Sequence, residues 1–246
     1  MKKDKFALIL GANSDIARAL AYLMAQKGWN LYLASRRLDP LNRLAQDLHL
    51  RYGCIAQALY FDALDYKSHG SFYKGLQPKP EGVVVAFGYL GPLKKPPKDF
   101  AEAEKIVQIN FLGAVSILEI VAKDLEKRKK GFIIGLSSVA GDRGRASNYI
   151  YGSSKAAFST YLQGLRQRLF KSGIQVLTVK PGFVVTKMTR DLDLPKHLVT
   201  QPEKVAQDIY RALKAGKDVL YTPFYWRFIM GAIKALPEGL FKRLKL

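Results

Sequence analysis

The chain has 246 residues, of which 48% are hydrophobic, and its 40 basic and 20 acidic side chains give a formal net charge of +20. This length suits one α/β domain with a sizeable core. The single cysteine, Cys54, excludes an intramolecular disulfide and the cysteine pattern of a zinc site, so no bound metal is expected. The charge imbalance favours polyanionic partners, namely nucleic acid, an anionic membrane or a phosphorylated substrate.

The N-terminal segment is basic from Met1 to Lys5 and then apolar from Phe6 to Leu10, before Gly11. Five apolar residues are too few for the apolar region of a signal peptide, so this run predicts a buried strand. No stretch approaches the ~20 apolar residues of a membrane span. A single cysteine also suits a reducing compartment. We therefore expect a cytoplasmic protein.

Apolar runs and helical stretches alternate along the chain. Seven runs predict strands, at Phe6–Leu10, Leu31–Ala34, Ile55–Tyr60, Gly82–Ala86, Gly131–Leu136, Gln175–Lys180 and Val219–Thr222. Helices are predicted at Ile16–Lys27, Leu41–His49, Phe100–Lys123, Tyr151–Lys171 and Pro202–Ala215. Near-continuous apolar strands separated by helices indicate a parallel sheet covered on both faces. The sequence predicts one doubly wound Rossmann-type domain over residues 1–246, with loose segments at 77–81, 88–98 and 187–200 and a basic aromatic tail at 223–246.

A tight turn follows the first predicted strand and leads into a helix. Such a turn places helix N–H groups on a pyrophosphate. Gly11 permits the turn, and Ser14 either donates its hydroxyl to phosphate or caps the helix. Only one of the three fingerprint glycines is present, so from this segment alone a plain strand–helix turn stays open as the alternative.

The second predicted strand leads into Ser35, Arg36 and Arg37. Dinucleotide-binding folds often place an acid here for the ribose 2′-hydroxyl of NAD. Ser35 carries no charge, and the arginines suit a 2′-phosphate, so NADPH is favoured over NADH. Two solvated arginines at a strand end are the alternative.

The most informative residues are Ser138, Tyr151 and Lys155. Tyr151 and Lys155 are four residues apart on a predicted helix, so they share a face. A phenol is a poor acid or base at neutral pH, and a nearby ammonium lowers its pKa by stabilising the phenolate. Ser138, thirteen residues earlier at a strand end, is placed to hold a substrate carbonyl while Tyr151 donates a proton.

These three residues, in this order and spacing, resemble the short-chain dehydrogenase/reductase family. Asn110 resembles the family's fourth catalytic residue, which organises a water for proton relay. Asp62 resembles its adenine-contacting acid. The resemblance extends over essentially the whole chain. It implies an NAD(P)H-dependent oxidoreductase that reduces a ketone, with Asn110, Ser138, Tyr151 and Lys155 as catalytic residues, and a homodimer or homotetramer.

The resemblance also implies a set of cofactor-binding residues. They are Gly11, Asn13, Ser14, Asp15, Ile16, Ser35, Arg36, Asp62, Ala63, Ala86, Phe87, Gly88, Tyr151, Lys155, Pro181, Gly182, Val184 and Thr186. Two segments depart from the family pattern. Asp15 and Ala17 stand where two glycines are usual, and Val85–Gly88 replaces an Asn-Asn-Ala-Gly segment. A carboxylate repels a pyrophosphate, so Asp15 is expected to point away or to serve the helix N-terminus.

Narrower features resemble the decaprenylphosphoryl-2-keto-β-D-erythro-pentose reductases. These are the segments 61–65 and 85–91 and the ending from Arg227 to Leu244. That resemblance implies a keto-sugar substrate on a polyprenyl phosphate, and a flavin oxidase as functional partner. The alternatives are a reductase of steroid or 3-oxoacyl ketones, or a non-catalytic NADP- or nucleic-acid-binding protein. The basic residues are scattered and no aromatic RNA-reading motif is present, which argues against nucleic acid.

The tail after Thr222 is aromatic, basic and amphipathic. Its apolar side is Trp226, Phe228, Ile229, Met230 and Ile233, beside Arg227 and Lys234. It resembles an interfacial anchor, so peripheral attachment to the inner face of an anionic membrane is one expectation. The alternative is a helix that closes the substrate pocket or is buried in a dimer.

Overall fold

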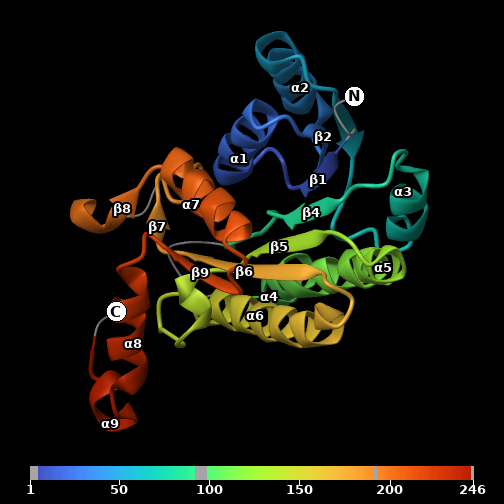
Figure 1. The fold of residues 1–246 in the computed structure, drawn as a ribbon. Helices are drawn as coiled ribbons and strands as arrows, with labels where there is room; N and C mark the ends of the chain where they lie inside the picture. The colour runs from blue at the N-terminus through green and yellow to red at the C-terminus, as the bar shows by residue number, and fades with distance from the viewer. Residues whose placement is uncertain (1–4, 92–98, 191–192, 245–246) are drawn as a thin grey trace.

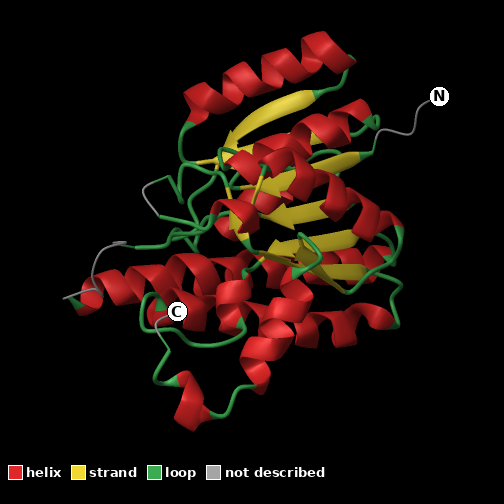
Figure 2. Ribbon diagram, turned by 90° about the vertical axis from the view of Figure 1, so that its left-hand side faces the viewer, coloured by secondary structure: helices red, strands yellow, loops and turns green. Residues whose placement is uncertain are grey.

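The computed structural model describes residues 5–91, 99–190 and 193–244. The start of the basic N-terminal segment, residues 92–98 of the predicted loose segment and Lys245 of the tail lie outside the described residues. Figure 1 shows one parallel sheet with helices packed on it, and α8 and α9 extending beyond it. Figure 2 shows helices on both sides of the strands.

The main sheet has seven strands, all parallel, in the order β3-β2-β1-β4-β5-β6-β9. Their bounds are β1 Phe6–Leu10, β2 Asn30–Ser35, β3 Ala56–Tyr60, β4 Gly82–Val85, β5 Phe132–Leu136, β6 Gln175–Pro181 and β9 Val219–Thr222. A second small sheet pairs β7 Phe183–Val184 with β8 Val199–Thr200. The predicted doubly wound Rossmann-type fold is thus confirmed, and each predicted main strand matches within two residues at either end.

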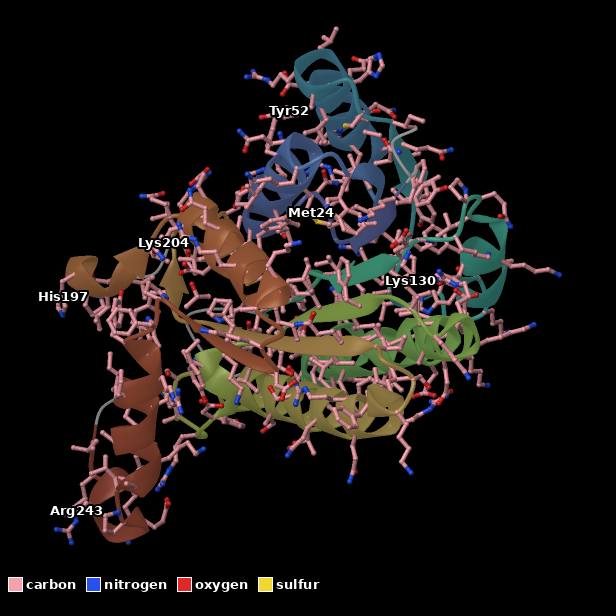
Figure 3. All side chains as sticks on the ribbon, viewed as in Figure 1. Met24, Tyr52, Lys130, His197, Lys204 and Arg243 are labelled. Carbon is pink, nitrogen blue, oxygen red and sulfur yellow. The ribbon has the colours of Figure 1, made fainter. Side chains whose placement is uncertain are left out.

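Two layers of helices bury the two faces of the sheet in separate apolar clusters. One cluster joins the sheet to α1 Asp15–Gln26, α2 Leu38–Tyr52 and α7 Pro202–Lys214. Met24 of α1, labelled in Figure 3, is fully buried there. The other cluster joins the sheet to α3 His69–Gly75, α5 Gly113–Arg128 and α6 Tyr149–Phe170. Continuous apolar strands are explained by this cover on both faces.

The order of the strands sets the position of the site. β1 lies between β2 and β4, so the chain crosses to the other half of the sheet after β3. At such a switch point the loops after neighbouring strands diverge and leave a crevice at the carboxyl ends. The turn after β1, the end of β2 and the segment after β4 therefore meet at one edge of the sheet.

Three predicted helix boundaries were wrong for identifiable reasons. α2 begins at Leu38, three residues before the prediction, because Pro40 sits in its first turn, where no backbone N–H is needed. The helix predicted at 100–123 is α4 Phe100–Val107, a π-helical segment Gln108–Leu112 and α5, which continues to Arg128. The tail, for which no helix bounds were predicted, contains α8 Trp226–Ala235 and α9 Glu238–Phe241.

The expectation that no stretch has the length and composition of a membrane span also needs correction. Among the described residues, one helix passes that test, Phe100–Arg128, with a mean hydropathy of 1.6. Half of the apolar window is buried within the protein. Its inner face, including Ile117, Leu118 and Val121, packs in the core beneath the sheet. A core helix of this kind is apolar for reasons of packing, and the test does not distinguish it from a span.

Candidate active site

Two adjoining cavities lie at the carboxyl edge of the sheet, with volumes of about 270 Å³ and 210 Å³. The first is lined by Ser138, Tyr151 and Lys155 on one side and by Asp15, Gly182 and Thr186 on another. The second is lined by Gly11, Ser35, Arg36, Asp62 and Ala63. Both share Asn13, Ser14, Ala86, Phe87 and Gly88. The cavities together form one elongated space, and apart from Asn110 every residue expected in the site lines it.

The turn after β1 depends on Gly11. Its φ is +82°, in the left-handed region, and a Cβ built on it would lie 2.4 Å from the backbone N of Phe87. Only glycine allows β1 and the segment after β4 to approach this closely. Ser14 takes the capping alternative, since its Oγ accepts a hydrogen bond from Ala17 N at 3.3 Å. Asp15 points away from the turn, where its Oδ2 accepts from the backbone N of Lys187 at 2.7 Å.

Asn13 carries an unsatisfied polar atom in the wall shared by both cavities. Its Nδ2 donates to Arg37 O at 2.9 Å, whereas its Oδ1 is buried and has no hydrogen-bond partner. A buried acceptor without a donor is unfavourable. A ligand with hydroxyl donors would satisfy it, as the ribose of a dinucleotide does. The unsatisfied acceptor and the two adjoining cavities that share its wall fit such a cofactor.

At the far end of the space, Asp62 is held by a residue that the sequence did not indicate. Asp62 Oδ1 accepts from Leu64 N at 3.0 Å. The ring of His69 is fully buried, stacks on Phe61, and places Nε2 2.9 Å from Asp62 O and Nδ1 2.9 Å from Ser116 Oγ. His69 thus fixes the backbone that presents Asp62. A lone histidine in a short helix gave no sequence signal for this.

Ser138 and Tyr151 meet at the inner end of the first cavity. Ser138 ends the extended segment after β5, and its Oγ accepts from Ala140 N at 3.1 Å. Burial raises the pKa of Tyr151 to about 12, and a hydrogen bond from Ser138 opposes the rise in part. The sequence predicted a pKa lowered by Lys155. That was wrong for this structure, because the ammonium lies 5.8 Å from the ring centroid and burial dominates.

Lys155 is 4% exposed, and its Nζ donates to Leu136 O at 3.0 Å. Burial lowers the pKa of Lys155 to about 8, because the surrounding protein disfavours the charged form. Nζ also faces Gly88, where a Cβ would lie 3.3 Å away. A glycine at this point leaves the ammonium directly beside the cavity.

A buried ammonium without a counter-ion predicts that Lys155→Met increases the free energy of unfolding at pH 7. Below the folded pKa of about 8, Lys155 is charged in both states, so the folded state bears the full free-energy cost of burying the ammonium. This cost falls as pH rises toward the unfolded pKa near 10.5, because the amine is then neutral in the folded and in the unfolded chain. The gain should be on the order of 2–3 kcal/mol at pH 7 and smaller at pH 10. Urea unfolding of both proteins at the two pH values measures it. A loss of stability at pH 7 would contradict it.

Asn110 lies behind the cavities, in the π-helical segment between α4 and α5. Its Nδ2 donates to Tyr89 O at 2.8 Å and to Ser154 Oγ at 3.0 Å, and its Oδ1 accepts from Tyr89 N at 2.7 Å. The same Oδ1 lies 3.3 Å from a Cβ built on Gly88. Asn110 therefore ties the segment after β4 to α6. A π-helical turn inside a long helix is a frequent mark of a functional site.

The C-terminal tail forms part of the site's support. Trp226 of α8 is 2% exposed, and its indole packs on Gly182, where a Cβ would overlap the ring. Trp226 and Met230 form a small apolar cluster with Val139, the residue after Ser138. Two of the five residues predicted to form a membrane-facing side thus belong to the core. These two residues pack beside Gly182 and Val139 and do not form an exposed apolar side.

Comparison with known proteins agrees with this geometry. Residues 5–196 match the model of the short chain dehydrogenase family. An uncharacterized oxidoreductase of Mycobacterium tuberculosis is 35% identical over 240 residues, covering 96% of each chain. One of Streptomyces coelicolor is 33% identical over 243 residues, covering 96% of this chain and 94% of the relative. The chain therefore belongs to the short-chain dehydrogenase family.

Solved structures show the same fold at lower identity. A short-chain dehydrogenase from Sphingobium yanoikuyae in complex with NADPH has a TM-score of 0.82 and 23% identity, covering 98% of this chain and 96% of its own. A 7β-hydroxysteroid dehydrogenase has a TM-score of 0.86 and 17% identity, with the same coverage. Fold and family together define an NAD(P)-dependent oxidoreductase that acts on CH–OH groups.

Proposed function

We propose that this protein reduces a ketone to a secondary alcohol with NADPH. The observation that carries the proposal is the meeting of Ser138, Tyr151 and Lys155 on one wall of a cavity whose other walls are the turn after β1 and the segment after β6. When bound, the nicotinamide supplies the hydride. Everything else in the step is positioning and proton transfer by side chains of this chain.

The proposed roles follow from the groups in place. Ser138 Oγ holds the carbonyl oxygen, and Tyr151 donates its phenolic proton to that oxygen as the alcohol forms. A pKa of about 12 keeps the phenol protonated at neutral pH, which suits a proton donor in reduction. Lys155 holds the ribose hydroxyls from its place beside the cavity. Asn110 fixes the segment after β4 through its bonds to the backbone of Tyr89.

NADPH is the proposed cofactor because Ser35 and Arg36 line the second cavity together with Gly11 and Asn13. A guanidinium beside an uncharged serine suits a 2′-phosphate, whereas a carboxylate at this place would repel it. The solved relative from Sphingobium yanoikuyae binds NADPH, which supports the proposal by analogy of fold.

The proposed substrate is a keto-sugar carried on a polyprenyl phosphate. The segments 61–65 and 85–91 and the tail support it through their resemblance to the keto-pentose reductases. The net charge of +20 suits a phosphorylated substrate. A flavin oxidase that forms the ketone is the proposed functional partner. An assay of NADPH oxidation with lipid-linked keto-pentose, steroid ketones and 3-oxoacyl thioesters tests the substrate class. Faster turnover of a steroid or acyl ketone would overturn the keto-sugar assignment.

A substrate held in a bilayer requires the enzyme to work at its surface, and we propose peripheral attachment through the tail from the cytoplasmic side. Phe224 and Phe228 are 73% and 69% exposed. Lys242 and Arg243 lie exposed on the same tail, and Arg243 projects from its end, away from the sheet (Figure 3). Each basic residue near an anionic surface contributes about 1 kcal/mol, and salt weakens the attraction.

We expect the protein to sediment with anionic vesicles at low salt and not with neutral ones. Phe224→Asp with Phe228→Asp should abolish most of this binding. Because Trp226 is buried, it is left unchanged. Phe100→Asp with Phe170→Asp is the matched control, since both side chains are 79% exposed and lie outside the tail. Failure of the intact protein to bind anionic vesicles, or equal loss in the control, would contradict attachment by the tail.

A further inference from the structure

Arg145 is a partly buried cation that lacks a carboxylate partner among the described residues. It lies in the loop between the 3₁₀ turn Val139–Gly141 and α6, so it falls between Ser138 and Tyr151 in the chain. Its Nη2 lies 3.3 Å from the sulfur of Met230, a weak acceptor. Its Nε is buried and has no hydrogen-bond partner. Burial lowers the pKa of its guanidinium, and only the attraction of Asp142 opposes this.

The acids near this loop already have other partners. Asp142 accepts from Lys180 Nζ at 2.5 Å through Oδ1 and from Tyr221 Oη at 2.7 Å through Oδ2. Glu238 pairs with Arg143 at 2.7 Å. Arg143 is held further by the carbonyl of Lys234 and by the ring of Phe241. Within the described ranges, Arg145 makes no ion pair within 4.0 Å.

A second unpaired donor lies on the same helix face as the sulfur that contacts Arg145. Trp226 and Met230 are one turn apart on α8, and both pack against Val139. The indole Nε1 of Trp226 is buried with no partner, beside Gly182 of the first cavity. The backbone of Gly182 covers this N–H, so of the two unpaired donors only the partly exposed guanidinium is open to a ligand.

We propose that Arg145 binds the phosphate ester of the keto substrate. This rests on the proposed function, since it names the anchor for the substrate of that same site. A guanidinium matches phosphate oxygens better than an ammonium does. A partly buried charge without a partner, one of whose N–H groups is fully buried, is unfavourable, so the position is explained if a ligand supplies the opposite charge.

Stability distinguishes this role from a purely structural one. A structural arginine would lose favourable contacts on replacement. An arginine held for a ligand would not, so Arg145→Met should leave the Tm unchanged or raise it. A clear fall in the Tm would show that Arg145 serves the fold and would overturn the proposal.

Calorimetric titration of the protein saturated with NADP⁺ tests binding directly, with geranyl phosphate, geraniol and inorganic phosphate as probes. We expect geranyl phosphate to bind more tightly than the other two. Arg145→Met should raise its dissociation constant by roughly 10–100-fold. Arg145→Lys should recover part of the loss. Arg227→Gln, which removes an exposed charge from α8, is the control and should bind as the unmodified protein does.

Three outcomes would overturn the proposal: equal affinity for geraniol, equal affinity for inorganic phosphate, or unchanged binding in Arg145→Met. Reduction of neutral ketones by the unmodified protein is measured separately. If no ketone is reduced while geranyl phosphate still binds through Arg145, the proposed reaction fails and the anion site stands. If ketones are reduced but geranyl phosphate binds no more tightly than geraniol, the proposed reaction stands and the anion site fails.

Discussion

Tyr151→Phe is expected to lower turnover by roughly 10²–10⁴-fold and to leave cofactor affinity nearly unchanged. The factor is what general acid catalysis commonly contributes. Tyr151 lines the first cavity, receives a hydrogen bond from Ser138 and is neutral at pH 7, with a pKa of about 12. Phe keeps the ring and removes only the proton donor. Because the loss concerns the transition state, kcat and kcat/KM should fall together.

Tyr149→Phe is the matched control for this variant. Tyr149 begins the same helix, is 48% exposed and does not line either cavity. Its turnover should stay close to that of the unmodified protein. Steady-state rates of NADPH oxidation, with cofactor affinity from fluorescence titration, give both quantities. Full turnover by Tyr151→Phe, or a large loss in Tyr149→Phe, would remove Tyr151 from the proposed mechanism.

Arg36→Ala should raise the dissociation constant for NADPH by roughly 10–100-fold and leave that for NADH nearly unchanged. A charge-assisted hydrogen bond to phosphate is worth about 1.5–3 kcal/mol. Only NADPH, which carries a 2′-phosphate, loses this hydrogen bond when Arg36 is replaced. The exposed position of Arg36 makes a large effect on folding unexpected.

Arg37→Ala provides a control with the same change in charge. Arg37 is also exposed, but its side chain does not line the second cavity. Its backbone carbonyl accepts from Asn13 Nδ2, a contact that the substitution keeps. Fluorescence titration with both cofactors measures the four dissociation constants. Equal affinity of the unmodified protein for NADPH and NADH would refute the preference.

The sheet was predictable because its strands are apolar on both faces and stand out from the helices between them. Boundaries failed where a local feature overrode the pattern. Pro40 reads as a helix breaker, yet in a first turn it is tolerated. The π-helical segment at Gln108–Leu112 was not predicted, because it is short and lies between two α-helical segments, so the whole stretch has the composition of one helix.

The candidate site was predictable where residue spacing carries chemistry, as with Tyr151 and Lys155. It was not predictable where contacts join distant segments. The packing of Trp226 on Gly182 links residues 44 positions apart. Arg145 stands out only once Asp142 is seen bonded to Lys180 and Tyr221. Whether a charge is paired depends on the folded chain.

Asp15 replaces a glycine and bonds to the backbone of Lys187, across 172 residues of sequence. Both residues line the first cavity and the larger groove beside it, so the bond crosses the wall between the two. The hydrogen bond joins the turn after β1 to the segment that follows β7. The segment cannot swing outward without breaking this bond. If a dinucleotide binds between this turn and this segment as proposed, its release by opening of the segment requires the bond to break, although the carboxylate need not contact the dinucleotide.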